Sequence, residues 1–178
     1  MKGKGHQQHA SRPGAPGGEH RTQVGGSFGG ARAPVADRGA GEESEVAALL
    51  RPPAQKETYF AANGKTIRTA LLDEEAQAMA EKLKELPNTQ LRRFYDPVVA
   101  LRLRAQAGKL DAEQIKAEMA MMKARAAYAY RRPGLKVPAE LVKFFTKHAA
   151  SVDSPEKFVA FARHFEAIVA YHRVHNPQ

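Results

Sequence analysis

Residues 111–134, DAEQIKAEMAMMKARAAYAYRRPG, predict a long amphipathic helix. At about 100° per residue, the apolar side chains of this stretch fall within an arc of roughly 80°. They are Ile115, Met119, Met122, Ala126 and Ala129. Asp111 with Gln114 three residues later is typical of a capping box, and Pro133-Gly134 marks the end of the helix. One side of this helix is therefore expected to pack against a core.

The same helix is strongly basic, with Lys123, Arg125, Arg131 and Arg132 in its last three turns. Lys116 and Lys123 flank one side of the apolar arc, and Arg125 and Arg132 flank the other. Guanidinium and ammonium groups hold phosphates, so cations beside a partly apolar face favour a polyanionic partner. Cations also solubilise ordinary helix surfaces, and this helix by itself leaves that alternative open.

Two helices are predicted before it. Apolar residues at spacings of three and four (Leu72, Ala76, Met79, Leu83 and Leu86) predict an amphipathic helix that ends before Pro87. A second helix is expected to begin with Thr89 as its N-cap and to stop at Gly108. Pro97 lies within it and lacks the N–H that a helix needs, which predicts a bend or a local break.

Two more helices are predicted after it. Val137-Pro138 begins the first, with Leu141, Phe144 and Phe145 facing inward. Ser154-Pro155 begins the last helix, whose apolar arc comprises Phe158, Phe161, Ala162, Phe165, Ile168, Val169 and His172. Five helices joined by short loops predict an all-α fold, a compact five-helix bundle.

The N-terminal third has a different composition. Residues 1–55 contain 11 of the 14 glycines and a single aromatic residue, which predicts a disordered Gly-rich tail. The helical domain is then expected to span residues 56–178. Asn63-Gly64 predicts either a small hairpin or an ordered turn that leads into the first helix.

Charge and cysteine content narrow the function classes. The net charge is +9, and residues 56–178 hold 21 Lys/Arg against 14 Asp/Glu, which favours nucleic acid, an anionic membrane surface or an acidic partner. The absence of cysteine excludes disulfides, thiolate catalysis and cysteine-ligated zinc. No segment resembles a signal peptide or a membrane span, so we expect a soluble cytoplasmic protein that binds no membrane.

The pattern argues against an enzyme. We find no paired carboxylates on a shared face, no nucleophile elbow and no phosphate-cradling loop, and hence predict no catalytic residue and no cofactor. His172 and His175 have a spacing that suits a metal, but no further ligand is evident, so no metal site is expected. His148 and His172 are interpreted as core histidines. Glu166 is expected to pair with a neighbouring base.

The tyrosines could stack on bases, as in single-strand binders. Tyr95 lies on the apolar arc of its helix and Tyr130 at the edge of another arc, so both are interpreted as mainly structural. Tyr128 lies on the far side of its helix and is the best candidate for exposure.

Five short segments then occur in a characteristic order. They are Tyr59-Phe60 with Asn63-Gly64, LLDEEA (71–76), TQLRRFYD (89–96), KARAAYA (123–129) and FEAIVAYH (165–172). Together they resemble the small helical subunit of type III-A CRISPR effector complexes, the Csm complex. The resemblance implies a non-catalytic subunit, present in more than one copy, that lies beside the repeating backbone subunit and contacts guide RNA and target RNA. RNA cleavage would belong to other subunits.

The resemblance also implies site residues. Basic side chains of the TQLRRFY-like and KARAAYA-like segments would grip the sugar–phosphate backbone, without reading sequence. Here these residues are Arg92, Arg93, Lys123, Arg125, Arg131 and Arg132. Pro97 departs from the family pattern and could redirect Arg92 and Arg93, so Lys123 and Arg125 are the principal candidates.

Two other functions compete with this interpretation. A helical protein–protein adaptor would use the same basic face to meet an acidic partner. A DNA-binding regulator would need a helix-turn-helix, for which residues 104–111 could supply the turn.

Overall fold

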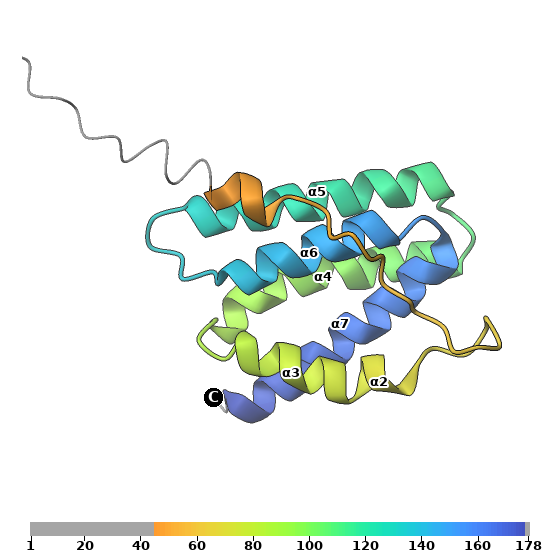
Figure 1. Cartoon of the computed structure of the whole chain (residues 1–178), viewed down its shortest axis with the longest axis horizontal. Coiled ribbons are helices and arrows are strands. Elements are labelled where there is room, and N and C mark those ends of the chain that lie inside the picture. Colours follow the sequence, from red (N-terminus) through yellow and green to blue (C-terminus); the bar gives the residue numbers. More distant parts are fainter. Residues whose placement is uncertain (1–44, 177–178) are drawn as a thin grey trace, which may run out of the picture. The chain divides into compact units, whose positions relative to one another are not determined.

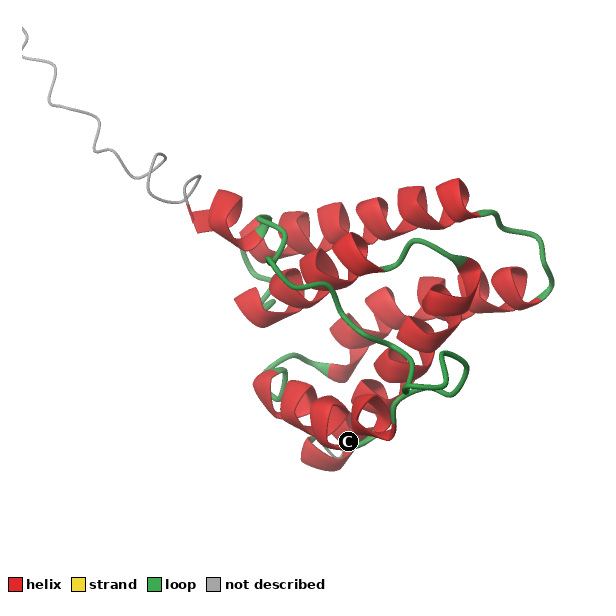
Figure 2. Ribbon diagram, turned by 45° about the vertical axis from the view of Figure 1, so that its right-hand side comes forward, coloured by secondary structure: helices red, strands yellow, loops and turns green. Residues whose placement is uncertain are grey.

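The computed structural model describes residues 45–176. Within this range the chain is helical and contains no regular strand, which confirms the all-α prediction (Figures 1 and 2). The helices are α2 (Thr69–Leu72), α3 (Glu74–Lys82), α4 (Asn88–Gln106), α5 (Ala112–Arg131), α6 (Ala139–Ser151) and α7 (Pro155–His175). Residues 45–49 form one further helical turn.

The first predicted helix is divided in two. Asp73 has φ −122° and ψ −98°, which interrupts the helix between α2 and α3. The carboxylate of Asp73 accepts a hydrogen bond from Tyr171 of α7 at 2.9 Å, a tertiary contact that fixes this residue. The interruption changes the register, so that Leu71 is buried and Leu72 is 37 % exposed. The expectation that Leu72 faces the core was therefore wrong.

Helix α4 starts one residue before its predicted cap. Asn88 is its first residue and Pro87 precedes it, so Thr89 is not the N-cap. The side-chain nitrogen of Asn88 donates to the carbonyl of Asn176 at 2.9 Å, and its side-chain oxygen lies 3.0 Å from Nδ1 of His172. These contacts tie the start of α4 to the end of α7. The helix is continuous through Pro97, so the local break predicted there does not occur.

Local signals set the ends of the other long helices as predicted. At the start of α5, the Asp111 side chain accepts from the Gln114 amide at 2.8 Å, and the Gln114 side chain accepts from the Asp111 amide at 3.0 Å. The Ser154 hydroxyl accepts from the amide of Lys157 at 3.3 Å and caps α7. Gly108 has φ +67°, in the left-handed region where glycine ends a helix without strain.

Two groups of helices meet in the core. Helix α7 packs against α3 and α4, while α5 packs against α6. Large aromatic side chains join the groups: Phe144 and Phe145 of α6 lie 5.5 and 5.6 Å, between ring centroids, from Phe165 of α7. All the side chains predicted to line the inner face of α7 are buried. The position of α5 therefore depends on its packing against α6, on the aromatic contact between α6 and α7, and on a smaller direct contact with α7.

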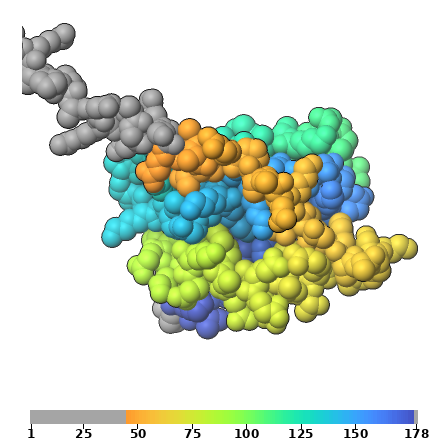
Figure 3. Space-filling model, viewed as in Figure 1, coloured from red at the N-terminus to blue at the C-terminus, as the bar shows by residue number. Residues whose placement is uncertain are grey.

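Residues 50–68, which we call the strap, cross α6 on their way to α2 (Figures 1 and 3). The Glu57 amide donates to the Ser151 hydroxyl at 2.8 Å, and the Glu57 carboxylate pairs with Lys147 and with Arg68. The hydroxyl of Tyr59 is hydrogen-bonded to Nδ1 of His148 at 2.6 Å. These contacts hold the strap against the bundle.

Two predictions concern this part of the chain: the turn at Asn63-Gly64 and the disordered tail. The Asn63-Gly64 segment forms a tight turn with a single bridge between Phe60 and Ile67, intermediate between the hairpin and the turn that the sequence left open. Most of the predicted tail lies outside the described residues. Of its last part, the turn at 45–49 buries Leu49 against the core.

Two buried histidines face one another beneath the strap. The rings of His148 and His164 lie 5.5 Å apart, between centroids, and His164 also contacts the carbonyl of Leu71. Burial lowers the pKa of His148, and the neighbouring His164 and Lys147 lower it further. Burial also lowers the pKa of His164. Both imidazoles are therefore neutral in the folded protein near neutral pH.

This burial predicts acid-sensitive stability. Below about pH 6.5 the unfolded chain binds more protons at these two histidines than the folded chain does, so the free energy of unfolding decreases as the pH is lowered. The expected slope is at most about 1.4 kcal/mol per pH unit for each histidine. Urea unfolding at pH 7.5 and pH 5.5 measures it. The H175Q variant, which lacks an exposed imidazole, should keep most of the difference, and equal stabilities at the two pH values would contradict the prediction.

Candidate nucleic-acid interface

Helix α5 presents its cations on different sides. Residues two apart on an α-helix point in directions about 160° apart, so Lys123 and Arg125 cannot face the same surface. The burial pattern agrees, since Lys123 is half-buried at the edge of the core and Arg125 is exposed. The structure does not bring the two principal sequence candidates together.

The outer face of α5 carries Glu118, Met121, Arg125 and Tyr128, and the C-cap residue Arg132 continues it. Tyr128 is 68 % exposed and Met121 is 51 % exposed. Within residues 45–176, neither the Arg125 nor the Arg132 side chain forms a hydrogen bond or ion pair with another residue. No acidic residue occurs in the sequence between Glu118 and Glu140, so no carboxylate on α5 beyond Glu118 offsets these charges. Arg131 is also exposed, in the last turn.

The side of α5 that holds Lys123 is partly occupied by the protein itself. Lys116 and Tyr130 lie seven residues before and after Lys123 and thus on the same side of the helix. Lys116 pairs with Glu113 at 2.7 Å, and the Tyr130 hydroxyl donates to Glu45 in the N-terminal helical turn. Lys123 is therefore less open to a large anionic ligand than Arg125.

Arg92 lies in a groove between α4 and α7. The groove has a volume of about 300 Å³, and its charged lining consists of Arg92 and Arg173 together with Asp96 and Glu166. Sequence analysis did not single out Arg173, although its place in the basic last turn of α7 was a readable signal. Arg93, the next residue along α4, is exposed. The two α4 candidates thus belong to a second candidate surface, separate from the outer face of α5, on which Asp96 and Glu166 accompany the arginines.

An ion-pair network occupies other arginines between the same two helices. The Glu166 carboxylate pairs with Arg102 at 2.6 Å and with Arg163 at 3.1 Å, as expected for this residue. Burial by itself would raise the pKa of Glu166, but the hydrogen bonds from Arg102 and Arg163 outweigh it and hold the pKa below its usual value. These two arginines maintain the fold and are not free to bind an anion.

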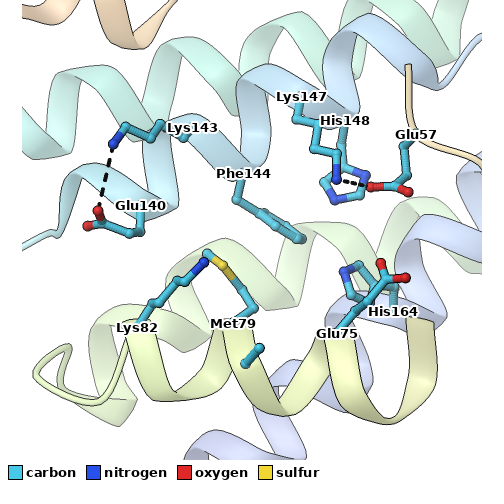
Figure 4. A pocket seen from close by; sticks show the side chains of 11 residues that line it. Glu57, Glu75, Met79, Lys82, Glu140, Lys143, Phe144, Lys147, His148 and His164 are labelled. Carbon is cyan, nitrogen blue, oxygen red and sulfur yellow. Dashed lines mark ion pairs between the residues drawn. The ribbon is translucent and has the colours of Figure 1, made fainter. Parts of the chain in front are cut away.

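A cavity of about 330 Å³ lies between α3 and α6 (Figure 4). His148, His164 and Phe144 lie on its inner side, and lysines and glutamates surround its opening. Lys147 pairs with Glu57, and Lys143 lies 3.8 Å from Glu140. This balance of charge does not suit a polyanion. Segments distant in the sequence build the cavity, which is why no sequence pattern revealed it.

Of the remaining candidates, His172 and Tyr95 have structural roles, whereas Tyr128 does not. Both ring nitrogens of His172 have partners, the side chain of Asn88 and the carbonyl of Leu83, each at 3.0 Å. Residues 45–176 contain no cluster of three or more His, Cys, Asp or Glu side chains suited to a metal. Tyr95 is half-buried against Phe165, and Tyr128 is exposed as predicted.

Comparison with known proteins identifies the family. A family model described as Csm2 Type III-A matches residues 67–178. The chain belongs to this family. This Csm2-family chain is accordingly a subunit of a type III-A CRISPR effector complex, in agreement with the resemblance of its motifs. No curated protein and no solved structure matches the chain.

The family match covers the helices of this Csm2-family protein and leaves out most of the strap. All of α2–α7 lie inside the matched region, and so do the outer face of α5 and the groove between α4 and α7. None of the helices within residues 45–176 has the length and apolar character to span a membrane.

The network around Glu166 supports a stability prediction. In the E166Q variant the Arg102 side chain, which is only 15 % exposed, loses its carboxylate. We expect the free energy of unfolding to decrease by about 1 kcal/mol. The decrease is modest because Glu166 is itself 37 % exposed. Chemical denaturation measures it. The matched E113Q variant removes the exposed partner of Lys116 and should leave the midpoint unchanged. Equal midpoints for all three proteins would show that the network adds nothing.

Proposed function

We propose that this Csm2-family subunit binds the sugar–phosphate backbone of guide and target RNA within its complex, without reading sequence. The observation that carries the proposal is the outer face of α5, where Arg125 and Arg132 are exposed and unpaired within the described residues. Backbone contacts position a nucleic acid but carry no sequence information. Such a subunit suits a complex in which base pairing with the guide selects the target.

The spacing of these two arginines suits an extended polyanion. They are seven residues apart, which places them about 10 Å apart along one side of the helix. Two points of attachment on a rigid helix fix the course of a strand better than one flexible cation does. Guanidinium groups also hold phosphate through two hydrogen bonds at once. The exposed Arg131 would add a third contact near the end of α5.

The other predicted cations have different parts in the proposal. Arg92 and Arg93 would make a second backbone contact from α4, together with Arg173 across the groove. Lys123 would contribute least, because it is half-buried at the edge of the core. The proposed partners are therefore guide RNA, target RNA, the repeating backbone subunit, other subunits and further copies of this chain.

We further propose that the subunit is not an enzyme. Nucleophilic and acid–base catalysis both need a reactive group placed beside a proton acceptor or donor that faces the substrate. On the outer face of α5, arginines are accompanied by a methionine, alanines and a tyrosine. The buried histidines lie beneath the strap and between α3 and α6, and they are occupied in packing. RNA cleavage is assigned to other subunits of the complex.

A double charge reversal tests the α5 contact. The R125E/R132E complex should bind unrelated RNA strands more weakly and to a similar extent. The slope of log affinity against log salt should be shallower by about 1.4 for this variant. Two phosphate contacts are lost, and each contributes about 0.7 to the slope on a single strand. Filter binding over a range of salt concentrations measures both quantities.

The matched control is K65E/K84E, which changes the net charge equally at exposed sites in the turn before α2 and after α3. This variant should keep the wild-type salt slope. An unchanged slope for R125E/R132E would refute the α5 contact. Crosslinks from the outer face of α5 to an acidic protein, with none to RNA, would instead favour the adaptor, and preference for one duplex DNA sequence would favour the regulator.

A further inference from the structure

Tyr128 differs from every other tyrosine in the protein. The chain has five tyrosines, all within the described residues. Tyr59 is hydrogen-bonded to His148, Tyr130 to Glu45 and Tyr171 to Asp73, and Tyr95 packs edge-on against Phe165. Within residues 45–176, Tyr128 forms no hydrogen bond and no ring contact, although it is the most exposed aromatic side chain. Neither its hydroxyl nor its ring serves the fold.

The surroundings of Tyr128 leave the ring accessible. A helical side chain leans toward the N-terminus, over the residues three and four positions earlier. At those positions lie Arg125 and Ala124, and Ala124 has only a methyl group with which to cover the ring. Arg132 follows four residues later, on the same side. An aromatic surface is thus held between two unpaired guanidinium groups on a rigid helix.

This combination is the one that single-strand binders use. Cations follow the phosphates while an exposed ring receives a base, and the stacking tolerates any base because each has a π-face. We propose that Tyr128 stacks on an unpaired nucleobase of single-stranded RNA whose phosphates contact Arg125 and Arg132. The proposal rests on the proposed function and adds a base contact to it.

The charge of the face selects RNA over a protein partner. The face carries Arg125 and Arg132, and no acidic residue occurs in the sequence between Glu118 and Glu140. A neighbouring helix docking here would have to cover Arg125 and Arg132, at a desolvation cost, unless it supplied matching carboxylates. An RNA strand supplies phosphates for the two arginines and a base for the aromatic ring, because every nucleotide carries both.

The test uses the full-length chain at low salt and three ligands of equal length. These are an oligouridylate, a ribose–phosphate strand without bases and an RNA duplex. We expect Y128A to bind the oligouridylate about tenfold more weakly, and to bind the other two ligands as the wild type does. Y128F keeps the ring and should bind all three normally. Tyr128 is exposed, so circular dichroism should show that both variants keep the fold.

The matched control is L103A, which removes an exposed apolar side chain from α4, away from the outer face of α5. It should leave the affinity for all three ligands unchanged. Equal losses for L103A and Y128A would mean that removing any exposed apolar side chain weakens binding, and would overturn stacking. Wild-type affinity of Y128A for the oligouridylate would overturn it too.

Failure of the stacking proposal can be told apart from failure of the phosphate contact. If R125E/R132E weakens binding to the strand without bases while Y128A has no effect on the oligouridylate, the backbone contact stands and stacking is wrong. If R125E/R132E has no effect on any ligand, the backbone contact itself is wrong. Absence of all binding by the wild-type chain at low salt would overturn both.

Discussion

The contact between the aromatic side chains of α6 and α7 is the interaction on which the rest of the structure depends. Phe144 and Phe145 close on Phe161 and Phe165, and this cluster joins the α5–α6 pair to the helices that pack on α7. Each fully buried phenylalanine contributes about 1.5–3 kcal/mol relative to exposure, so the cluster is a large share of the cohesion between the two groups. Because α6 packs against the Met and Ala arc of α5, the opposite side of α5 faces outward.

The fold divides its cations into two classes. Arg102 and Lys147 pair with carboxylates that come from distant segments, Glu166 and Glu57, and these contacts fix the α4–α7 interface and the strap. Arg68 and Arg163 are also paired, with Glu57 and Glu166. Arg125 and Arg132 have no such partner within the described residues. An unpaired surface arginine costs the fold little because water solvates it, yet it remains available to an anion. The positive charge left without a partner within the described residues is therefore smaller, and more localised, than the net charge of the chain.

The sequence predicted what short-range chemistry decides. Capping at Asp111 and Ser154, the stops near Gly108 and Gly134, and the buried faces of α6 and α7 all follow from residues within one or two turns. It failed at Asp73 and Asn88, where contacts with α7 about 90 residues away override helix periodicity and capping preference. For the candidate site, the sequence identified the basic helices but not which cations remain free. Tertiary partners such as Glu45 and Glu57 decide that, and no local pattern indicates them.

Stacking on Tyr128 is compatible with binding that ignores sequence. Recognition of a particular base requires hydrogen bonds to its edge, and α5 offers none beside the ring beyond arginines that suit phosphates. A ring accepts any base, so it strengthens attachment without restricting which RNA is bound. Stacking does require the base to be unpaired, because a duplex keeps its bases stacked on one another. The outer face of α5 would therefore distinguish single strands from duplexes, a form of selectivity that phosphate contacts alone do not provide.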